Sequence, residues 1–363
     1  MTNKSSKTVS PPLVGILFIL FETVTLITGC SSTYSVTPVS GYEQINLVAD
    51  TAGYNTSRID INLLNAWGMA ISPSGAFWIA GNHSGMSIIY DGTGKQVLAP
   101  VNIPLGTAPH GSSPSGVIFN STTDFTIPGN GLSSFIFSTE DGILSAWNNN
   151  TGGSSITVVD RSLAGAVYKG LAIANDGGAN FIYATDFHNG KIDVFDTNFS
   201  FVTTKPFNDP DIPAGFAPFN IQNIDGQLYV TYAKQLGPDN HDDNAAPGNG
   251  YVDIYSAAGI LVKRFAAQGT LNSPWGMAKV RTAAFGQTSN AILIGNFGDG
   301  HINVFDSNGT YQGQLMKNGS PISISALWAI MFDTISPADP SQLYFTAGPG
   351  GETHGLFGYV KKI

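Results

Sequence analysis

The feature that most constrains the fold is a unit that recurs about every fifty residues along the chain. Each copy has a small apolar segment after Trp-Gly or a related pair, then a Gly-rich turn and a second apolar segment. A third segment of the type Ile-x-Val-Phe-Asp follows. The clearest copies begin at Tyr168 and Pro274. One sheet of three or four such strands cannot bury both of its faces, so the copies must stack on one another.

One residue marks the same place in every copy, directly before the Gly-like position. These markers lie 48 to 56 residues apart and are Trp67, Ser115, Lys169, Phe219, Trp275 and Trp328. Six units of this length predict an all-β fold, a six-bladed β-propeller that covers residues 42–363. A two-sheet β-sandwich is the alternative, but its strands would not recur in threes and fours at a fixed period.

The last copy lacks an outer strand, because only the strand-like segments 343–347 and 355–360 follow Trp328. The segment 42–48 precedes the first copy and has no blade of its own. We therefore expect this N-terminal strand to pair with the C-terminal strand and complete the last blade. Such a clasp would remove two open sheet edges, which otherwise promote aggregation.

The composition excludes several classes of protein. The 363 residues carry a formal net charge of -9, which disfavours a nucleic-acid partner, since that would need clustered Lys and Arg. A single cysteine excludes an intramolecular disulfide framework and a Cys-rich zinc site. Charged residues make up 11% and there are 43 glycines, which disfavours a helical bundle. We expect a monomer.

The N-terminus has the features of an export signal. Lys4 and Lys7 precede the apolar run 13–21, which is too short to span a bilayer alone. The sequence Ile27-Thr28-Gly29-Cys30 then resembles a bacterial lipobox, which predicts a signal peptide over 1–29, a lipid on Cys30 and a tether over 30–41. The expected location is the bacterial outer membrane, or the cell surface or periplasm, with the lipid as membrane anchor. An uncleaved anchor (13–29), another export route and a cytoplasmic chain are the alternatives.

Polar residues follow the second strand-like segment of every copy. They are Asn82 and His83, Glu140 and Asp141, Asp186 and His188, Asp239 to Asp243, Asn296 and Asp299, and Glu352 and His354. In a propeller these loops share one face, at the mouth of the axial channel. Carboxylate and amide oxygens suit Ca²⁺ or Mg²⁺, and the metal-ligand candidates are Glu140, Asp186, Asn220 and Asn296. The alternative is that Asp and Asn occupy these loops as ordinary turn residues.

The marker residues form a second group of candidates. Trp67, Phe219, Trp275 and Trp328 would surround the mouth and stack on a ligand, or they would instead pack between the blades. Lys169 would be the cation of the mouth, or would pair with Asp186 of its own blade. His83 and His188 complete the ligand-binding candidates.

Several longer phrases carry a resemblance to a known family. They include Asn65-Ala66-Trp67-Gly68, Tyr168-Lys169-Gly170 and Leu293-Ile294-Gly295-Asn296-Phe297-Gly298-Asp299-Gly300. The chain resembles NHL-type six-bladed propellers, and more closely an uncharacterised family of exported bacterial propellers, some of which carry a PEP-CTERM sorting tail. The resemblance implies the fold and an exported setting, and it implies no activity. The last residues, 359–363, contain no Pro-Glu-Pro motif.

No Walker loop, Rossmann fingerprint, Gly-x-Ser-x-Gly elbow or His-Glu-x-x-His motif occurs in the sequence. We therefore predict a non-enzymatic binding or scaffold module that presents its mouth to a cell-envelope protein or a carbohydrate. The alternative is a metal-dependent hydrolase or lactonase that uses Glu140, Asp186, Asn220 and Asn296.

Overall fold

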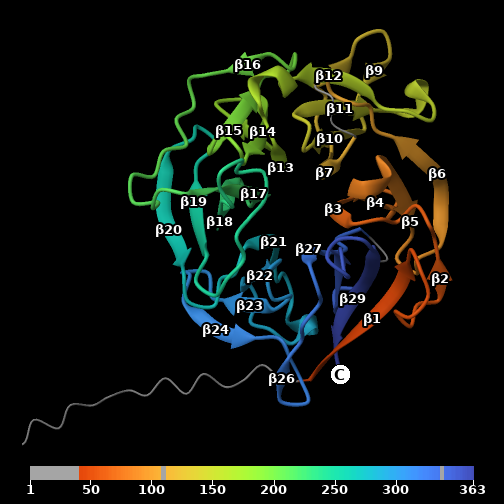
Figure 1. Ribbon diagram of the computed structural model, residues 1–363, viewed down its shortest axis with the longest axis vertical. Coiled ribbons are helices and arrows are strands. Elements are labelled where there is room, and N and C mark those ends of the chain that lie inside the picture. The colour runs from red at the N-terminus through yellow and green to blue at the C-terminus, as the bar shows by residue number, and fades with distance from the viewer. Residues whose placement is uncertain (1–40, 108–111, 336–338) are drawn as a thin grey trace, which may run out of the picture. The chain divides into compact units, whose positions relative to one another are not determined.

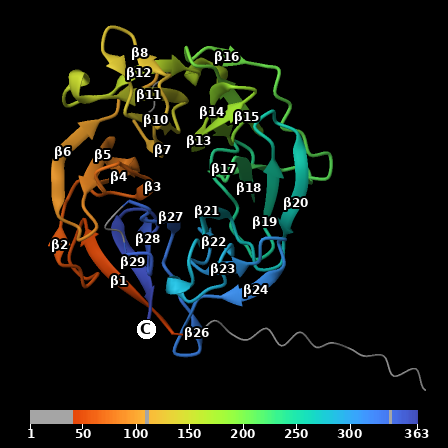
Figure 2. The same cartoon turned by 180° about the vertical axis from the view of Figure 1, so that it is seen from behind.

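The computed structural model describes residues 41–107, 112–335 and 339–363, which form six β-sheets around a central axis (Figure 1). The view from behind shows the same ring with the sheets in sequence order (Figure 2). The predicted six-bladed β-propeller is therefore confirmed. Helical structure in the described part is limited to four short 3-10 turns, Asn82–Ser84, Asn149–Thr151, Ser162–Ala164 and Ala283–Phe285.

Each blade runs from an inner strand at the axis to an outer strand at the rim. Blade 1 comprises β3 (Ala66–Ile71), β4 (Phe77–Gly81), β5 (Met86–Tyr90) and β6 (Gln96–Asn102). Blade 2 comprises β7 (Pro114–Phe119), β10 (Phe135–Thr139), β11 (Ile143–Trp147) and β12 (Ile156–Asp160). Blade 3 comprises β13 (Tyr168–Asp176), β14 (Ala179–Asp186), β15 (Lys191–Phe195) and β16 (Phe201–Val202).

Blade 4 comprises β17 (Phe216–Ile224), β18 (Gln227–Lys234), β19 (Gly250–Tyr255) and β20 (Leu261–Ala267). Blade 5 comprises β21 (Pro274–Lys279), β22 (Ile292–Asn296), β23 (Ile302–Phe305) and β24 (Tyr311–Gln314). Blade 6 comprises β27 (Leu327–Phe332), β28 (Gln342–Ala347) and β29 (Leu356–Lys362), and β1 (Tyr42–Ala49) and β2 (Arg58–Ile59) complete it. Two small hairpins lie outside the blades, β8 (Thr126–Ile127) with β9 (Gly131–Leu132), and β25 (Met316–Lys317) with β26 (Ser320–Pro321).

The ring closes as the sequence predicts. Strand β1 pairs antiparallel with β29, with Tyr42 opposite Lys362 and Ala49 opposite Leu356. The Tyr42 hydroxyl also donates a hydrogen bond to the carbonyl of Phe285 in blade 5, at 2.8 Å. The two ends of the described chain thus lie in one sheet, which gives blade 6 the outer strand that its own repeat lacks.

The glycines after the markers have a packing reason. A side chain at Gly68 would collide with the carbonyl oxygen of Ser115 on the neighbouring inner strand, and one at Gly276 would collide with that of Trp328. Inner strands converge at the axis, so in four blades there is no room for a Cβ atom directly after the marker. Glycine occupies this position in blades 1, 2, 3 and 5, whereas Asn220 and Ala329 occupy it in blades 4 and 6.

Apolar side chains from neighbouring sheets fill the space between the blades. Among the described residues, no helix has the length and apolar character needed to cross a membrane. The predicted signal peptide (1–29), Cys30 and almost all of the tether (30–41) lie outside the described residues.

Candidate functional site

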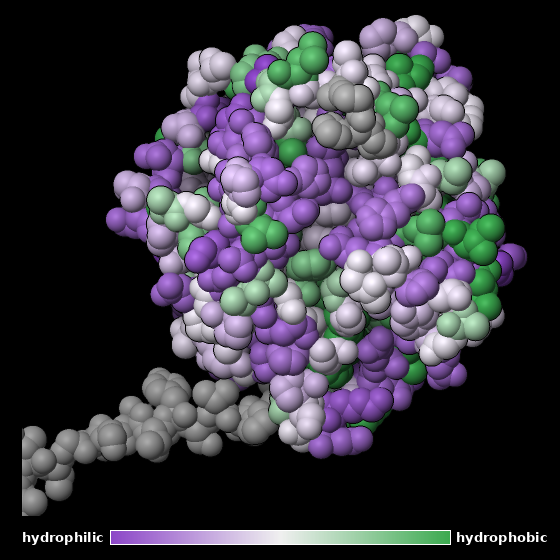
Figure 3. All heavy atoms as spheres, in the orientation of Figure 1, coloured by the Kyte–Doolittle hydropathy of each residue, from purple (hydrophilic) through white to green (hydrophobic). Residues whose placement is uncertain are grey.

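One face of the ring carries the loops between the second and third strands of each blade and the loops that enter the inner strands. We call it the mouth face. Space-filling spheres show hydrophilic residues gathered around its centre (Figure 3). The markers lie at the mouth end of the inner strands, because each inner strand begins on this face.

Six aromatic residues fill the channel directly below the mouth, and we call them the aromatic plug. They are Trp67, Phe187, Phe219, Trp275, Phe297 and Trp328. Trp67 of blade 1 stacks on Trp328 of blade 6 with ring centroids 3.8 Å apart. Phe219 of blade 4 lies 5.9 Å from Trp328, and a contact between two blades that are not neighbours crosses the axis.

The plug decides between the two hypotheses for the aromatic markers. Trp67, Phe219, Trp275 and Trp328 are all buried, with at most 4% of their surface exposed. Trp67, Phe219 and Trp275 each pack against Trp328, which supports the packing hypothesis for the four markers. They form the floor of the mouth, and Trp275 also lines a cavity beyond it.

A buried ammonium group stands on this floor. Lys169 is only 2% exposed, and its Nζ atom lies 5.0 Å from the Trp67 ring centre and 5.8 Å from that of Phe187. Nζ donates a hydrogen bond to Oε1 of Glu140, which follows β10 in the preceding blade. A buried cation requires such a partner, since its desolvation costs several kcal/mol. Lys169 thus pairs with Glu140 at the mouth, and the alternative pair with Asp186 does not form.

A chain of hydrogen bonds continues from Glu140 across the mouth. Asn82 donates to the second Glu140 oxygen at 2.8 Å, and Asn65 donates to Asn82 at 3.3 Å. Asn65 also donates to Glu352 at 2.8 Å and accepts the indole N–H of Trp328 at 3.0 Å. Burial, together with the nearby charge of Glu140, raises the pKa of Glu352 to about 7, although the Asn65 hydrogen bond opposes the shift.

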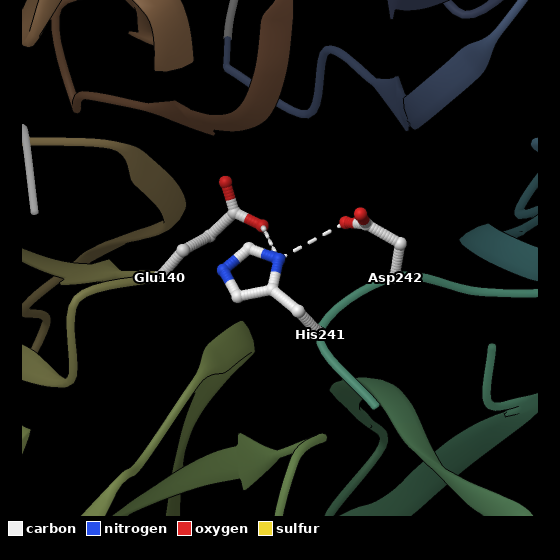
Figure 4. Close-up of side chains that lie close together, drawn as sticks. All are labelled: Glu140, His241 and Asp242. Carbon is white, nitrogen blue, oxygen red and sulfur yellow. Dashed lines mark hydrogen bonds and ion pairs between the residues drawn. The ribbon is translucent and has the colours of Figure 1, made fainter. Parts of the chain in front are cut away.

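The loop between β18 and β19 folds back over this network. Figure 4 shows His241 and Asp242 of this loop pointing toward Glu140 of blade 2. The His241 Nδ1 atom lies 3.0 Å from Asp242 and 4.0 Å from Glu140. The hydrogen bond between His241 and Asp242 raises the pKa of His241 and lowers that of Asp242.

These three side chains are the described group of carboxylates and histidines best placed to hold a metal ion, since their ligand atoms lie within 4.8 Å of one another. The fit is poor in one respect. Lys169 already occupies Oε1 of Glu140, and its Nζ atom lies 3.9 Å from Asp242. A divalent cation at this group would have to displace or tolerate a buried positive charge.

A pocket of about 540 Å³ opens beside this group, and we call it the mouth pocket. Seven of its ten described lining residues have polar or charged side chains. It is lined by Ser113, Glu140, Asp141, Ser162, Gly165, Ala166, Val167, His188, Asp239 and His241. The His188 Nδ1 atom lies 2.7 Å from the backbone oxygen of Asp239, so blade 3 and the β18–β19 loop meet at its edge.

The sequence-predicted metal ligands have separate partners. The Asp186 carboxylate accepts hydrogen bonds from the backbone N–H of Val167 and the amide of Asn189. Asn220 donates to the carbonyl of Trp275, and Asn296 donates to the carbonyl of Thr270. Among the four candidates, Glu140 alone belongs to the group with His241 and Asp242.

The remaining sequence candidates divide in two. His188 lines the mouth pocket, whereas His83 is exposed on blade 1 and is not part of the lining. His110 lies outside the described residues. The sequence places His241, Asp141 and Glu352 on the mouth face, but they are not among the candidates selected from it. Asn65 is not among them either, although it begins the phrase Asn65-Ala66-Trp67-Gly68 directly before the first inner strand.

A second cavity, of about 310 Å³, lies toward the other end of the channel. Residues of all six inner strands line it, and most of them are apolar. Asn220, Gln222 and Asn223 supply its polar atoms on the blade 4 side.

Comparison with known proteins gives relatives in a virus. No family model matches the chain. It is 32% identical over 339 residues to uncharacterized protein L690 of Acanthamoeba polyphaga mimivirus, a match that covers 88% of this chain and 86% of the relative. It is 31% identical over 334 residues to uncharacterized protein R648 of the same virus, which covers 88% of this chain and 80% of that relative.

Solved structures show a related fold at low sequence identity. A protein of unknown function from Bacteroides thetaiotaomicron matches with a TM-score of 0.56 and 9% identity, over 88% of this chain and 76% of that one. A virginiamycin B lyase from Staphylococcus aureus matches with a TM-score of 0.51 and 13% identity, over 89% and 99%. At such identities the likeness concerns the fold alone.

Proposed function

Since the chain belongs to the same family as L690 and R648 of Acanthamoeba polyphaga mimivirus, which are described only as uncharacterized, we propose a function from its own geometry. The protein is a non-enzymatic binding propeller that holds a carbohydrate in the mouth pocket. The observation that carries this proposal is a pocket of about 540 Å³ in which seven of the ten described lining residues have polar or charged side chains. Pockets of this size on a preformed scaffold hold small-molecule ligands, which their polar groups orient.

Titration calorimetry of the purified full-length protein with a panel of monosaccharides and short glycans tests the proposal. We expect saturable binding without turnover of the ligand. His241→Ala should weaken it about tenfold, the effect of losing one good hydrogen bond. His83→Ala is the matched control, because His83 lies on the same face outside the pocket, and it should leave the affinity unchanged. Failure of every glycan to bind would reject the proposal.

A metal-dependent hydrolase is the second candidate, and the close approach of Glu140, His241 and Asp242 favours it. Metal analysis of the purified protein separates the two functions. The binding function predicts no stoichiometric divalent ion and unchanged melting in chelator. A bound Ca²⁺ or Mg²⁺ that is lost in Glu140→Gln would favour the hydrolase instead.

The predicted lipid anchor completes the proposal, since a tethered binding module would retain its ligand at the cell envelope. The support is the lipobox-like sequence that ends in Cys30. Incorporation of labelled fatty acid by the full-length protein in a bacterial host tests the anchor. We expect labelling and membrane association of the wild type, both lost in Cys30→Ser. An unlabelled wild type would exclude the anchor.

A further inference from the structure

The lining of the mouth pocket carries an excess of negative charge. Three carboxylates, of Glu140, Asp141 and Asp239, line it, and its described lining includes no lysine or arginine. The nearest ammonium, that of Lys169, is already bonded to Glu140. Asp141 and Asp239 therefore contribute two carboxyl groups that form no ion pair with a described lysine or arginine.

Asp141 has an unfilled hydrogen-bonding requirement. The residue is 3% exposed, and its Oδ2 atom accepts the backbone N–H of Gly106. Its Oδ1 atom is buried and has no hydrogen-bond partner among the described residues. A buried carboxylate oxygen without a donor is costly, and such atoms in native proteins call for an explanation. A ligand that brings a donor to this side of the pocket would supply one.

A metal ion does not meet this requirement well. Asp141 is not part of the group whose ligand atoms converge within 4.8 Å, and that group already contacts Lys169. A larger molecule can reach Asp141 and Asp239 separately in a volume of about 540 Å³. An alkylammonium group provides three N–H donors together with a positive charge, and charge-assisted hydrogen bonds to carboxylates are the stronger kind.

We infer that the ligand of the mouth pocket is an amino sugar, whose protonated amine is recognised by the carboxylate of Asp141. This inference rests on the proposed carbohydrate-binding function. It adds that the ligand carries a positive charge and that Asp141 is the residue that binds this charge.

Calorimetry with three probes tests the inference on the full-length protein at a pH where the free amine is protonated. The probes are glucosamine, N-acetylglucosamine, in which acetylation removes the charge, and glucose, which lacks the nitrogen. We expect glucosamine to bind at least about tenfold more tightly than the other two probes, because each of these lacks one charge-assisted hydrogen bond. Equal binding of all three probes would overturn the inference and leave the proposed function intact. If neither these probes nor any other glycan binds, both the inference and the proposed function are overturned.

Variants locate the recognition. Asp141→Asn should reduce glucosamine affinity about tenfold or more and bring it close to that of glucose. Asp211→Asn removes one charge from an exposed position outside the pocket and should leave the affinity unchanged. Unchanged affinity in a folded Asp141→Asn variant would overturn the assignment. If that variant does not fold, the preference among the three probes on the wild type decides the inference.

Discussion

Replacement of Lys169 by methionine would leave the Glu140 carboxylate in the mouth without its cation. The side chain of Glu140 is 10% exposed, and that of Lys169 is 2% exposed. Breaking a buried ion pair by removing one partner costs about 3–5 kcal/mol, because the remaining charge is uncompensated. The second Glu140 oxygen keeps its 2.8 Å hydrogen bond from Asn82, so we expect a loss at the lower end, about 3 kcal/mol.

The double variant Lys169→Met/Glu140→Gln makes this expectation sharper. Removing both charges leaves only a neutral amide in the mouth, so the double variant should lose about 1 kcal/mol. Urea unfolding followed by tryptophan fluorescence measures the free energy of unfolding of the single and the double variant. The control is Lys95→Met at an exposed position, which should stay within about 0.5 kcal/mol of the wild type. A Lys169→Met variant that loses less than about 1 kcal/mol, or a double variant as unstable as the sum of its singles, would refute the reasoning.

Three further predictions concern pH, ring closure and the axis. The raised pKa of Glu352 means that the folded protein binds a proton more readily than the unfolded chain. Its contribution to stability is therefore present below the ordinary pKa of glutamate and is lost as the pH rises through about 7. Between pH 5 and pH 8, the free energy of unfolding should fall less in Glu352→Gln than in the wild type, as chemical unfolding measures. An equal fall in both proteins would contradict the raised pKa of Glu352. In the clasp, Val48→Asp places a charge at a fully buried site and should abolish cooperative melting. Glu43→Gln on the same strand removes only a partly exposed ion pair with Lys361, so it should lose at most about 1 kcal/mol and keep cooperative melting. At the axis, Gly276→Ala should lose about 1–3 kcal/mol by overpacking against the Trp328 carbonyl, while Gly153→Ala, which meets no atom within 4 Å, should be neutral in urea unfolding.

The architecture is predictable from the sequence because the steric constraint between neighbouring inner strands recurs along the chain. Gly68 and Gly276 meet the same obstacle, the backbone of the next inner strand, and glycine occupies this place in four of the six repeats. The clasp is predictable for a similar reason, since a ring of sheets leaves an unpaired edge at β29 that only β1 remains to cover.

The partners of the mouth residues do not repeat, and the sequence does not predict them. The repeat pattern offers Lys169 two possible carboxylate partners, Glu140 of the preceding blade and Asp186 of its own blade. The structure shows that Asp186 is engaged by Val167 and Asn189, which leaves Glu140 for the lysine. His241 reaches Glu140 through a loop that belongs to blade 4, and the composition of that loop says nothing about where it folds.

The aromatic plug explains why recognition in this propeller should depend on loops more than on the channel. Trp67, Phe219 and Trp275 all pack against Trp328 at the axis, so they leave little surface for a ligand at the mouth. The polar groups that line the mouth pocket belong to blade 2, blade 3 and the β18–β19 loop. A family member could therefore exchange its ligand by changing these loops, with no change to the marker and glycine pattern that holds the ring together.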